Sequence, residues 1–256
     1  MASANGDRVG FINEHGWWLY RGMITPDTSA RAVRWLESTA ERAAETPALE
    51  PEFEEEPVDG RYPLRKLRRI LWNDEAFWIP LLDSAGLIDL GRSLVGGETV
   101  IIRHAAFLKP GMVGSEVAFH QDQVLWGKQQ YPGAVMAWIA LAPCRPENGC
   151  LQVCPGSHRL GPVPHREQAG YEPGVSAASR IGHPFVVPGE DGVPEPIDVV
   201  MDPGDVLVWH RYMVHGSRPN QSRQARTSMV LAFADASAPG FAAKDVYRCS
   251  SLATRS

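Results

Sequence analysis

Two histidines and an aspartate have the residue types and spacing of a metal site. His120 and Asp122 are two residues apart in "AFHQDQVLWG". Side chains at i and i+2 of a strand point to the same face, so an imidazole and a carboxylate could approach one ion together. His215 follows later, in "MVHGS". Two histidines and one carboxylate leave three positions open on a six-coordinate metal, which suits a non-haem Fe(II) centre that must bind a cosubstrate and O₂.

The second histidine of this set has a competitor. His210 ends the preceding run "PGDVLVWH" and is either the ligand or a residue of the core. His215 is the better candidate because Gly-Ser follows it and an arginine lies eleven residues downstream. Gln121 lies inside the motif, and the two-residue period of a strand points it away from the metal face.

That arginine is Arg226, which opens the apolar run "RTSMVLAFA". It is either a surface charge at the end of a strand or a guanidinium that holds a carboxylate by two parallel hydrogen bonds. The cosubstrate 2-oxoglutarate has such a carboxylate at the end remote from its metal-chelating keto acid. Ser217 shares the face of His215 by the two-residue period and could donate a second hydrogen bond to the same carboxylate.

Together these motifs resemble the phytanoyl-CoA dioxygenase family of Fe(II)/2-oxoglutarate-dependent oxygenases. The resemblance spans residues 62–235 and rests on "HQD" at 120–122, "ENGCLQVCPGSH" at 147–158 and "PGDVLVWH" at 203–210, with His215 and Arg226. It implies a mainly β protein with N-terminal helices, in which a double-stranded β-helix (a cupin-like jelly roll) has helices packed on one sheet. It implies Fe(II), 2-oxoglutarate and O₂, with His120, Asp122 and His215 as catalytic metal ligands and a cosubstrate site of Arg226, Ser217, Trp138 and Lys66.

Two of the residues in this cosubstrate set have simpler alternatives. Trp138 could be a core aromatic, and Lys66 lies in a cationic run, 65–69, that could be solvated. Arg103 and Trp126 are candidate substrate contacts. Arg103 stands in the apolar run "VIIRHAAFL", where it needs an anionic partner in either a ligand or a structural ion pair.

The resemblance implies oxidation of an unactivated C–H bond of a small molecule, with hydroxylation the leading expectation. The same chemistry also yields oxidative cyclisation, epimerisation or desaturation. Halogenases of the wider superfamily replace the carboxylate ligand by a small residue, so Asp122 argues against halogenation. Bacterial natural-product metabolism is the expected setting.

Two readings from other classes remain open. One is a non-catalytic jelly-roll binding protein whose metal site only stabilises the fold. Such a protein would be expected to lack one of the ligands or Arg226, but all of them are present. The other is a cupin-type isomerase without 2-oxoglutarate, against which Ser217 and Arg226 argue.

The elements that must position these residues divide the chain in two. Residues 1–99 are expected to be largely helical, with helices over 25–45 and over 74–94, the second broken near Pro80, and a solvated acidic loop at 50–57. Short apolar runs bounded by Gly, Pro, Asn and Asp predict the jelly-roll core at 100–235. The Gly/Pro-rich insertion at 160–182 is the expected lid, and 236–256 the tail, of one domain over 1–256.

Composition excludes several classes of protein. The chain has 25 Lys and Arg against 30 Asp and Glu, a net charge of −5, so no basic surface predicts nucleic-acid binding. No stretch approaches the ~20 apolar residues of a membrane helix, and the N-terminus has no secretory h-region. Four cysteines without zinc spacing predict free buried thiols in a reducing cytoplasm. We expect a small-molecule substrate and a monomer or small homo-oligomer.

Overall fold

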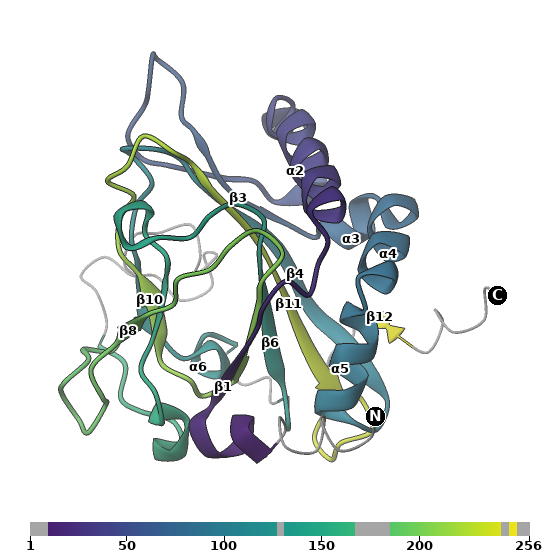
Figure 1. Cartoon of the computed structure of the whole chain (residues 1–256), viewed down its shortest axis with the longest axis vertical. Coiled ribbons are helices and arrows are strands. Elements are labelled where there is room, and N and C mark those ends of the chain that lie inside the picture. Colours follow the sequence, from purple (N-terminus) through teal and green to yellow (C-terminus); the bar gives the residue numbers. More distant parts are fainter. Residues whose placement is uncertain (1–9, 127–130, 167–184, 242–245, 250–256) are drawn as a thin grey trace.

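Two antiparallel β-sheets face each other in the protein (Figure 1). The computed structural model describes residues 10–126, 131–166, 185–241 and 246–249. The larger sheet has the order β1-β9-β6-β11-β4-β3-β2, with β12 beside β4, and the smaller has the order β5-β10-β7-β8. The strands are β1 (Trp17–Tyr20), β2 (Glu52–Phe53), β3 (Leu64–Arg68), β4 (Thr99–Lys109), β5 (Val117–His120), β6 (Val135–Ala140), β7 (Leu151–Val153), β8 (Ile197–Asp198), β9 (Val206–His210), β10 (His215–Ser217), β11 (Arg226–Asp235) and β12 (Tyr247–Arg248). The predicted jelly roll is confirmed.

The central strands of the larger sheet are largely apolar because both faces of that sheet are covered. On β6, Val135, Ala137 and Ile139 belong to the core beneath the helices. Met136 and Trp138, which alternate with them, belong to the core between the two sheets. Burial on both faces selects continuous apolar runs in place of strict alternation. The run "AVMAWIAL" is therefore a doubly buried strand.

Helices cover the outer face of the larger sheet, where Figure 1 shows α2 to α5 side by side. The helices are α2 (Pro26–Ala40), α3 (Ile70–Asn73), α4 (Glu75–Ser84), α5 (Leu87–Val95) and α6 (Asp122–Leu125), with short 3₁₀ turns at Ala43–Glu45, Pro47–Leu49, Pro146–Asn148 and Ser157–Leu160. The Thr25 side chain caps α2 by accepting from the N–H of Thr28. The predicted break near Pro80 is wrong, since Pro80 lies inside α4. The chain instead breaks at Gly86, whose φ of 70° ends α4.

The first 99 residues contribute more than helices. β1 pairs with β9, and β3 pairs with β4. The prediction of a largely helical support at 1–99 is therefore wrong in part. These strands are short and gain their partners from distant parts of the chain, so local periodicity does not reveal them. The tail also joins the sheet, because β12 pairs with β4.

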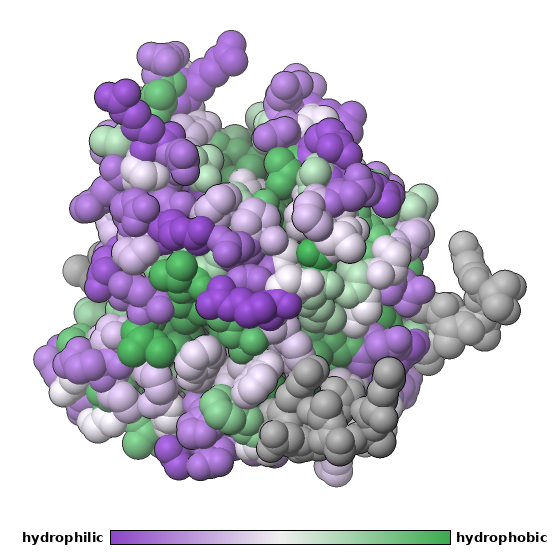
Figure 2. All heavy atoms as spheres, in the orientation of Figure 1, coloured by the Kyte–Doolittle hydropathy of each residue, from purple (hydrophilic) through white to green (hydrophobic). Residues whose placement is uncertain are grey.

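The acidic segment at 50–57 is only partly solvated. Glu52 and Glu54 are buried, and Glu52 forms an ion pair with Arg68 (Nη2 to Oε1, 2.6 Å). Glu54 accepts a hydrogen bond from the N–H of Ser115. The following residues, up to 62, are exposed. Figure 2 shows a mainly hydrophilic surface at this end of the molecule, which is formed by α2 and the loop that follows β2.

The four cysteines are free and buried, as predicted, and burial raises the pKa of the Cys144 thiol to about 11. Among the described residues, no helix combines the length and the apolar composition that crossing a membrane requires. Most of the expected lid, 167–182, lies outside the described residues. Its first part is anchored, since Arg166 forms an isolated β-bridge with Phe185.

His104 on β4 makes the stability of the fold depend on pH. Its Nδ1 accepts from the N–H of Leu71, and burial, with help from Arg69 and Arg103, lowers its pKa to about 4. The unfolded chain takes up this proton near the ordinary value of 6.5, whereas the folded chain does so only near 4. The free energy of unfolding should therefore fall as the pH drops from 6.5 towards 4, by about 2 kcal/mol from this residue.

Urea unfolding of metal-free protein at about pH 7 and about pH 4.5 measures this slope. His104→Asn keeps an acceptor for Leu71 and removes the titration, so its loss of stability in acid should be smaller than that of the wild type. Equal losses in both proteins would assign the acid sensitivity to other groups.

Candidate active site

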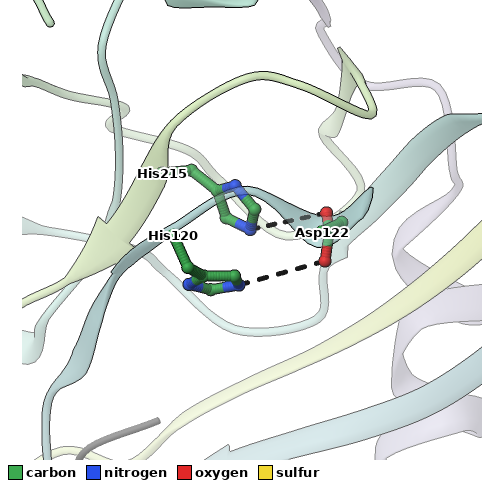
Figure 3. A group of neighbouring side chains, drawn as sticks. All are labelled: His120, Asp122 and His215. Atoms are coloured by element: carbon green, nitrogen blue, oxygen red, sulfur yellow. Dashed lines mark ion pairs between the residues drawn. The ribbon is translucent and has the colours of Figure 1, made fainter. Parts of the chain in front are cut away.

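The three predicted ligands come together between the two sheets (Figure 3). β5 ends at His120 and β10 begins at His215, and these two residues are direct cross-strand partners. One ligand atom from each of His120, Asp122 and His215 lies within 4.8 Å of the others. Asp122 Oδ1 is 3.9 Å from Nε2 of His120, and Asp122 Oδ2 is 3.6 Å from Nε2 of His215.

Asp122 reaches this position by a route that differs from the expected one. The prediction that His120 and Asp122 share the face of one strand is wrong, because β5 stops at His120 and Asp122 begins the short helix α6. The turn is fixed by Gln121, which points away from the ligands as predicted. Its amide donates to the carbonyl oxygens of Gly161 and Tyr212 and accepts from the N–H of Val163.

The surrounding backbone sets the imidazoles for metal binding. Nδ1 of His120 is 2.8 Å from the carbonyl oxygen of Ala118, and Nδ1 of His215 is 3.0 Å from that of Met213. A carbonyl oxygen only accepts, so both Nδ1 atoms carry the proton and both Nε2 atoms are unprotonated, the state in which they can bind a metal. The indole of Trp209 donates to Oδ2 of Asp122 at 3.0 Å. Outer hydrogen bonds of this kind hold metal ligands in place.

His210 does not join this group. Its Nδ1 accepts from the N–H of Tyr212, and its ring lies edge-on to His158, 5.5 Å between centroids. Burial lowers the pKa of His210 to about 4, which keeps the ring neutral. The structure thus favours His215 over His210. Because two imidazoles and a carboxylate are donors that suit Fe(II), the residues present fit an iron ion.

Arg226 and Ser217 lie together with a third polar residue, Lys109. Nζ of Lys109 donates to Oγ of Ser217 at 2.8 Å and to the carbonyl oxygen of Arg218. Arg226 is the cross-strand partner of Lys109 and donates to the carbonyl oxygen of Gly149. Its Nε is buried without a hydrogen-bond partner. Since the Ser217 oxygen accepts from Lys109, its proton is free for donation.

Lys109 is the residue that the sequence did not reveal. It is 4% exposed, and burial, together with the charge of Arg226, lowers its pKa to about 6. Burial also lowers the pKa of Arg226. In the described part of the chain neither residue forms an ion pair. A buried guanidinium with an orphaned N–H, next to a buried lysine amine, creates a site that a carboxylate would complete.

Two motif residues shape this anion site. The guanidinium carbon of Arg226 lies 5.3 Å from the ring centroid of Trp138, so Trp138 supports the arginine and also belongs to the core. Gly149 has a φ of 70°, and a Cβ there would lie 2.3 Å from the carbonyl oxygen of Arg218. The turn "ENGC" therefore needs glycine to bring its carbonyl group to Arg226.

A cavity of about 440 Å³ opens beside the metal ligands. Among the described residues that line it are two metal ligands, His120 and Asp122. Lys66, Arg103 and Trp126, which the sequence predicts as cosubstrate or substrate contacts, also line it. Nζ of Lys66 lies 4.6 Å from the centroid of Phe107, and burial lowers the pKa of Lys66 to about 7. Trp138, Ser217 and Arg226 do not line this cavity. Phe107 and Val117 also line a small second cavity with Lys109 and Arg226, so the two sites are neighbours.

Comparisons with known proteins agree with this architecture. A probable phytanoyl-CoA dioxygenase of Caenorhabditis elegans is 23% identical over 88% of this chain and 73% of its own length. The peroxisomal phytanoyl-CoA dioxygenase of Bos taurus is 28% identical over 55% of this chain, but the match spans only 41% of the bovine protein.

Solved structures share the fold. The α-ketoglutarate-dependent epimerase SnoN from nogalamycin biosynthesis is 20% identical, with a TM-score of 0.64 over 92% of this chain and 85% of its own. The carbocyclase SnoK from the same biosynthesis is 18% identical, with a TM-score of 0.66 over 97% of this chain and 88% of its own. Residues 12–228 match the family described as phytanoyl-CoA dioxygenase, a range that contains all three candidate ligands and every strand except most of β11 and all of β12. The chain belongs to the phytanoyl-CoA dioxygenase family.

Proposed function

We propose that the protein is a non-haem Fe(II)/2-oxoglutarate-dependent dioxygenase that oxidises an unactivated C–H bond of a small molecule. The observation that carries the proposal is the pairing of two sites. One is a cage of His120, Asp122 and His215 with oriented donors. The other is the buried cationic site of Lys109 and Arg226 beside it.

The chain's own residues have distinct tasks in this reaction. His120, Asp122 and His215 would hold the iron. Arg226, supported by Trp138, would bind the remote carboxylate of 2-oxoglutarate, with Ser217 and Lys109 as further hydrogen-bond donors. Arg65, Phe107 and Val117 line both cavities and so connect the site of Arg226 with the metal cavity.

When bound, iron and 2-oxoglutarate together activate O₂, with release of CO₂ and succinate. The protein orients the substrate C–H bond in the 440 Å³ cavity and excludes side reactions. Lys66 at the cavity wall is a further contact of the cosubstrate in this proposal, as its family position implies.

Hydroxylation is the outcome that we propose. Solved structures of similar fold include an epimerase and a carbocyclase, so the fold also accommodates other outcomes. Their origin in nogalamycin biosynthesis supports a role for this protein in the tailoring of a secondary metabolite.

An anaerobic titration tests the proposal. Fe(II) and 2-oxoglutarate added together should give the weak visible charge-transfer band of the chelate, and Fe(II) alone should not. In air, the loaded protein should form succinate slowly even without its substrate. A non-catalytic jelly-roll protein would bind the metal but give neither the band nor succinate, and that result would overturn the proposal.

A further inference from the structure

We propose that the substrate carries an anionic group, a carboxylate or a phosphate ester, on an apolar body, and that Arg65 and Arg103 bind this group at the mouth of the metal cavity. The inference rests on the proposed function, because it names the class of substrate for the same centre. Arg226 does not line this cavity, although Arg65 also lines the small second cavity that contains Arg226.

Basic residues gather on the cavity because of strand register. Lys66 and Arg68 on β3 pair with Phe107 and Ala105 on β4. Alternate residues of a strand share a face, and all four of these residues line the cavity. The same face of the larger sheet is directed towards the metal ligands.

Arg103 follows Phe107 and Ala105 to this wall by the two-residue period, and a β-bulge adds Ile102 beside it. Ala232 pairs with Arg103, but the next residue of β11, Phe233, pairs with Ile101, so Ile102 is the extra residue of β4. Ile102 and Arg103 consequently both line the cavity. Bulges beside active sites commonly redirect a side chain in this way. Arg103 is exposed within a strand whose neighbouring residues are buried.

The charge of the described cavity lining is unbalanced. Five basic residues line it, against two carboxylates, those of Glu50 and Asp122. Arg69 forms an ion pair with Glu50 (Nε to Oε1, 2.5 Å) and Arg68 forms one with Glu52, so neither contributes to the excess of positive charge, and Asp122 belongs to the metal cage. Arg65 forms no ion pair with any described residue, and its hydrogen bond to the carbonyl oxygen of Glu116 is long, at 3.4 Å.

The excess of positive charge is local. The whole chain has a net charge of −5, so a basic cavity is not the product of a generally basic surface. Clefts lined by one sign of charge concentrate the field and attract ligands of the opposite sign. Guanidinium groups bind carboxylates and phosphates through two parallel hydrogen bonds. The chemistry of the lining therefore selects an anion.

The rest of the lining describes the remainder of the substrate. Apolar side chains make up much of the remaining lining: Trp72, Ile102, Ala105, Phe107, Val117, Trp126 and Val230. Arg103 is exposed, whereas His120 is buried, so the anion binds at the solvent end and the apolar body extends towards the metal. Fixing the charged end orients one C–H bond at the reacting centre.

Matched probes test this inference without knowledge of the substrate. Naphthalene-2-carboxylate and naphthalene-2-carboxamide have the same apolar body and differ in charge. Their affinities are measured by calorimetry on protein loaded with Zn(II) and saturating 2-oxoglutarate, so that Arg226 already holds its own carboxylate. The carboxylate should bind about 10-fold or more tightly than the amide, and less so at high salt. 2-Naphthyl phosphate, as a third probe, distinguishes a phosphate site from a carboxylate site.

Three variants locate the effect. Arg103→Gln and Arg65→Gln should each reduce the preference for the charged probe several-fold, whereas Arg31→Gln, a substitution on the exposed face of α2, should leave it unchanged. The charge-transfer band of Fe(II) and 2-oxoglutarate in Arg103→Gln checks that the fold and the metal centre are intact.

The outcomes separate this inference from the proposed function. No preference for the charged probe, or a preference that both cavity variants retain, would overturn the anion site even when the chelate band forms. If the band is absent and the charged probe still binds through Arg65 and Arg103, the anion site stands and the proposed oxygenase function fails.

Discussion

His120→Ala and Asp122→Ala should each remove iron and abolish activity while leaving the fold intact. Each residue supplies one of only three protein bonds to the metal, and the remaining pair cannot fix the geometry of the ion. Because changes to outer hydrogen-bond partners already cost 10–100-fold in metal affinity, loss of a ligand should weaken Fe(II) or Co(II) binding by about 100-fold or more. Co(II) titration, followed by its visible bands, measures the affinity, and circular dichroism checks the fold.

His210→Gln is the matched control for this experiment. His210 is also a neutral, largely buried histidine near the site, but its Nδ1 accepts a backbone hydrogen bond and its ring packs against His158. This variant should bind metal as the wild type does. If His120→Ala and Asp122→Ala bind Co(II) unchanged, or if His210→Gln loses it, the cage of His120, Asp122 and His215 is wrong.

The three candidate ligands could be predicted because the chemistry constrains them more than the backbone does. An iron site of this kind requires two imidazoles and one carboxylate, and many backbone arrangements can bring "HQD" and His215 to one ion. The prediction of the ligands was therefore correct even though Asp122 lies on a helix and not on a strand. The sequence could not show that β5 ends at His120. That end depends on Gln121, whose partners Gly161, Val163 and Tyr212 are 40–91 residues away.

The roles of Lys109 and of the basic cavity could not be predicted from the local sequence either, because both depend on which strands pair. In "FLKPG", Lys109 looks like an ordinary polar residue at the end of a strand, and only its pairing with Arg226, across the sheet, reveals two buried cations side by side. Likewise, the run 65–69 looks solvated until β3 is seen to pair with β4. Net charge describes the chain as a whole and says nothing of where cations meet.

Arg226→Ala should weaken binding of 2-oxoglutarate by about 10–200-fold, because a charged hydrogen-bond pair is worth about 1.5–3 kcal/mol. Binding of the substrate or of the naphthalene probes should change much less, since Arg226 does not line the main cavity. Calorimetry with 2-oxoglutarate on the Zn(II)-loaded protein measures the loss.

Arg226→Ala also removes the hydrogen bond to Gly149 and the support of Trp138, so a second variant is needed to separate binding from folding. Arg226→Lys keeps a positive charge and loses the two-pronged geometry, and should therefore retain more affinity than Arg226→Ala but less than the wild type. Lys109→Met should give a smaller loss than Arg226→Ala, because Lys109 already donates to Ser217 and Arg218. Unchanged affinity for 2-oxoglutarate in folded Arg226→Ala would move the carboxylate site elsewhere, with Lys66 the next candidate. If the loss of affinity for 2-oxoglutarate is instead graded, and largest for Arg226→Ala, then Arg226 and Lys109 face the same carboxylate. Their cross-strand pairing places them side by side for this.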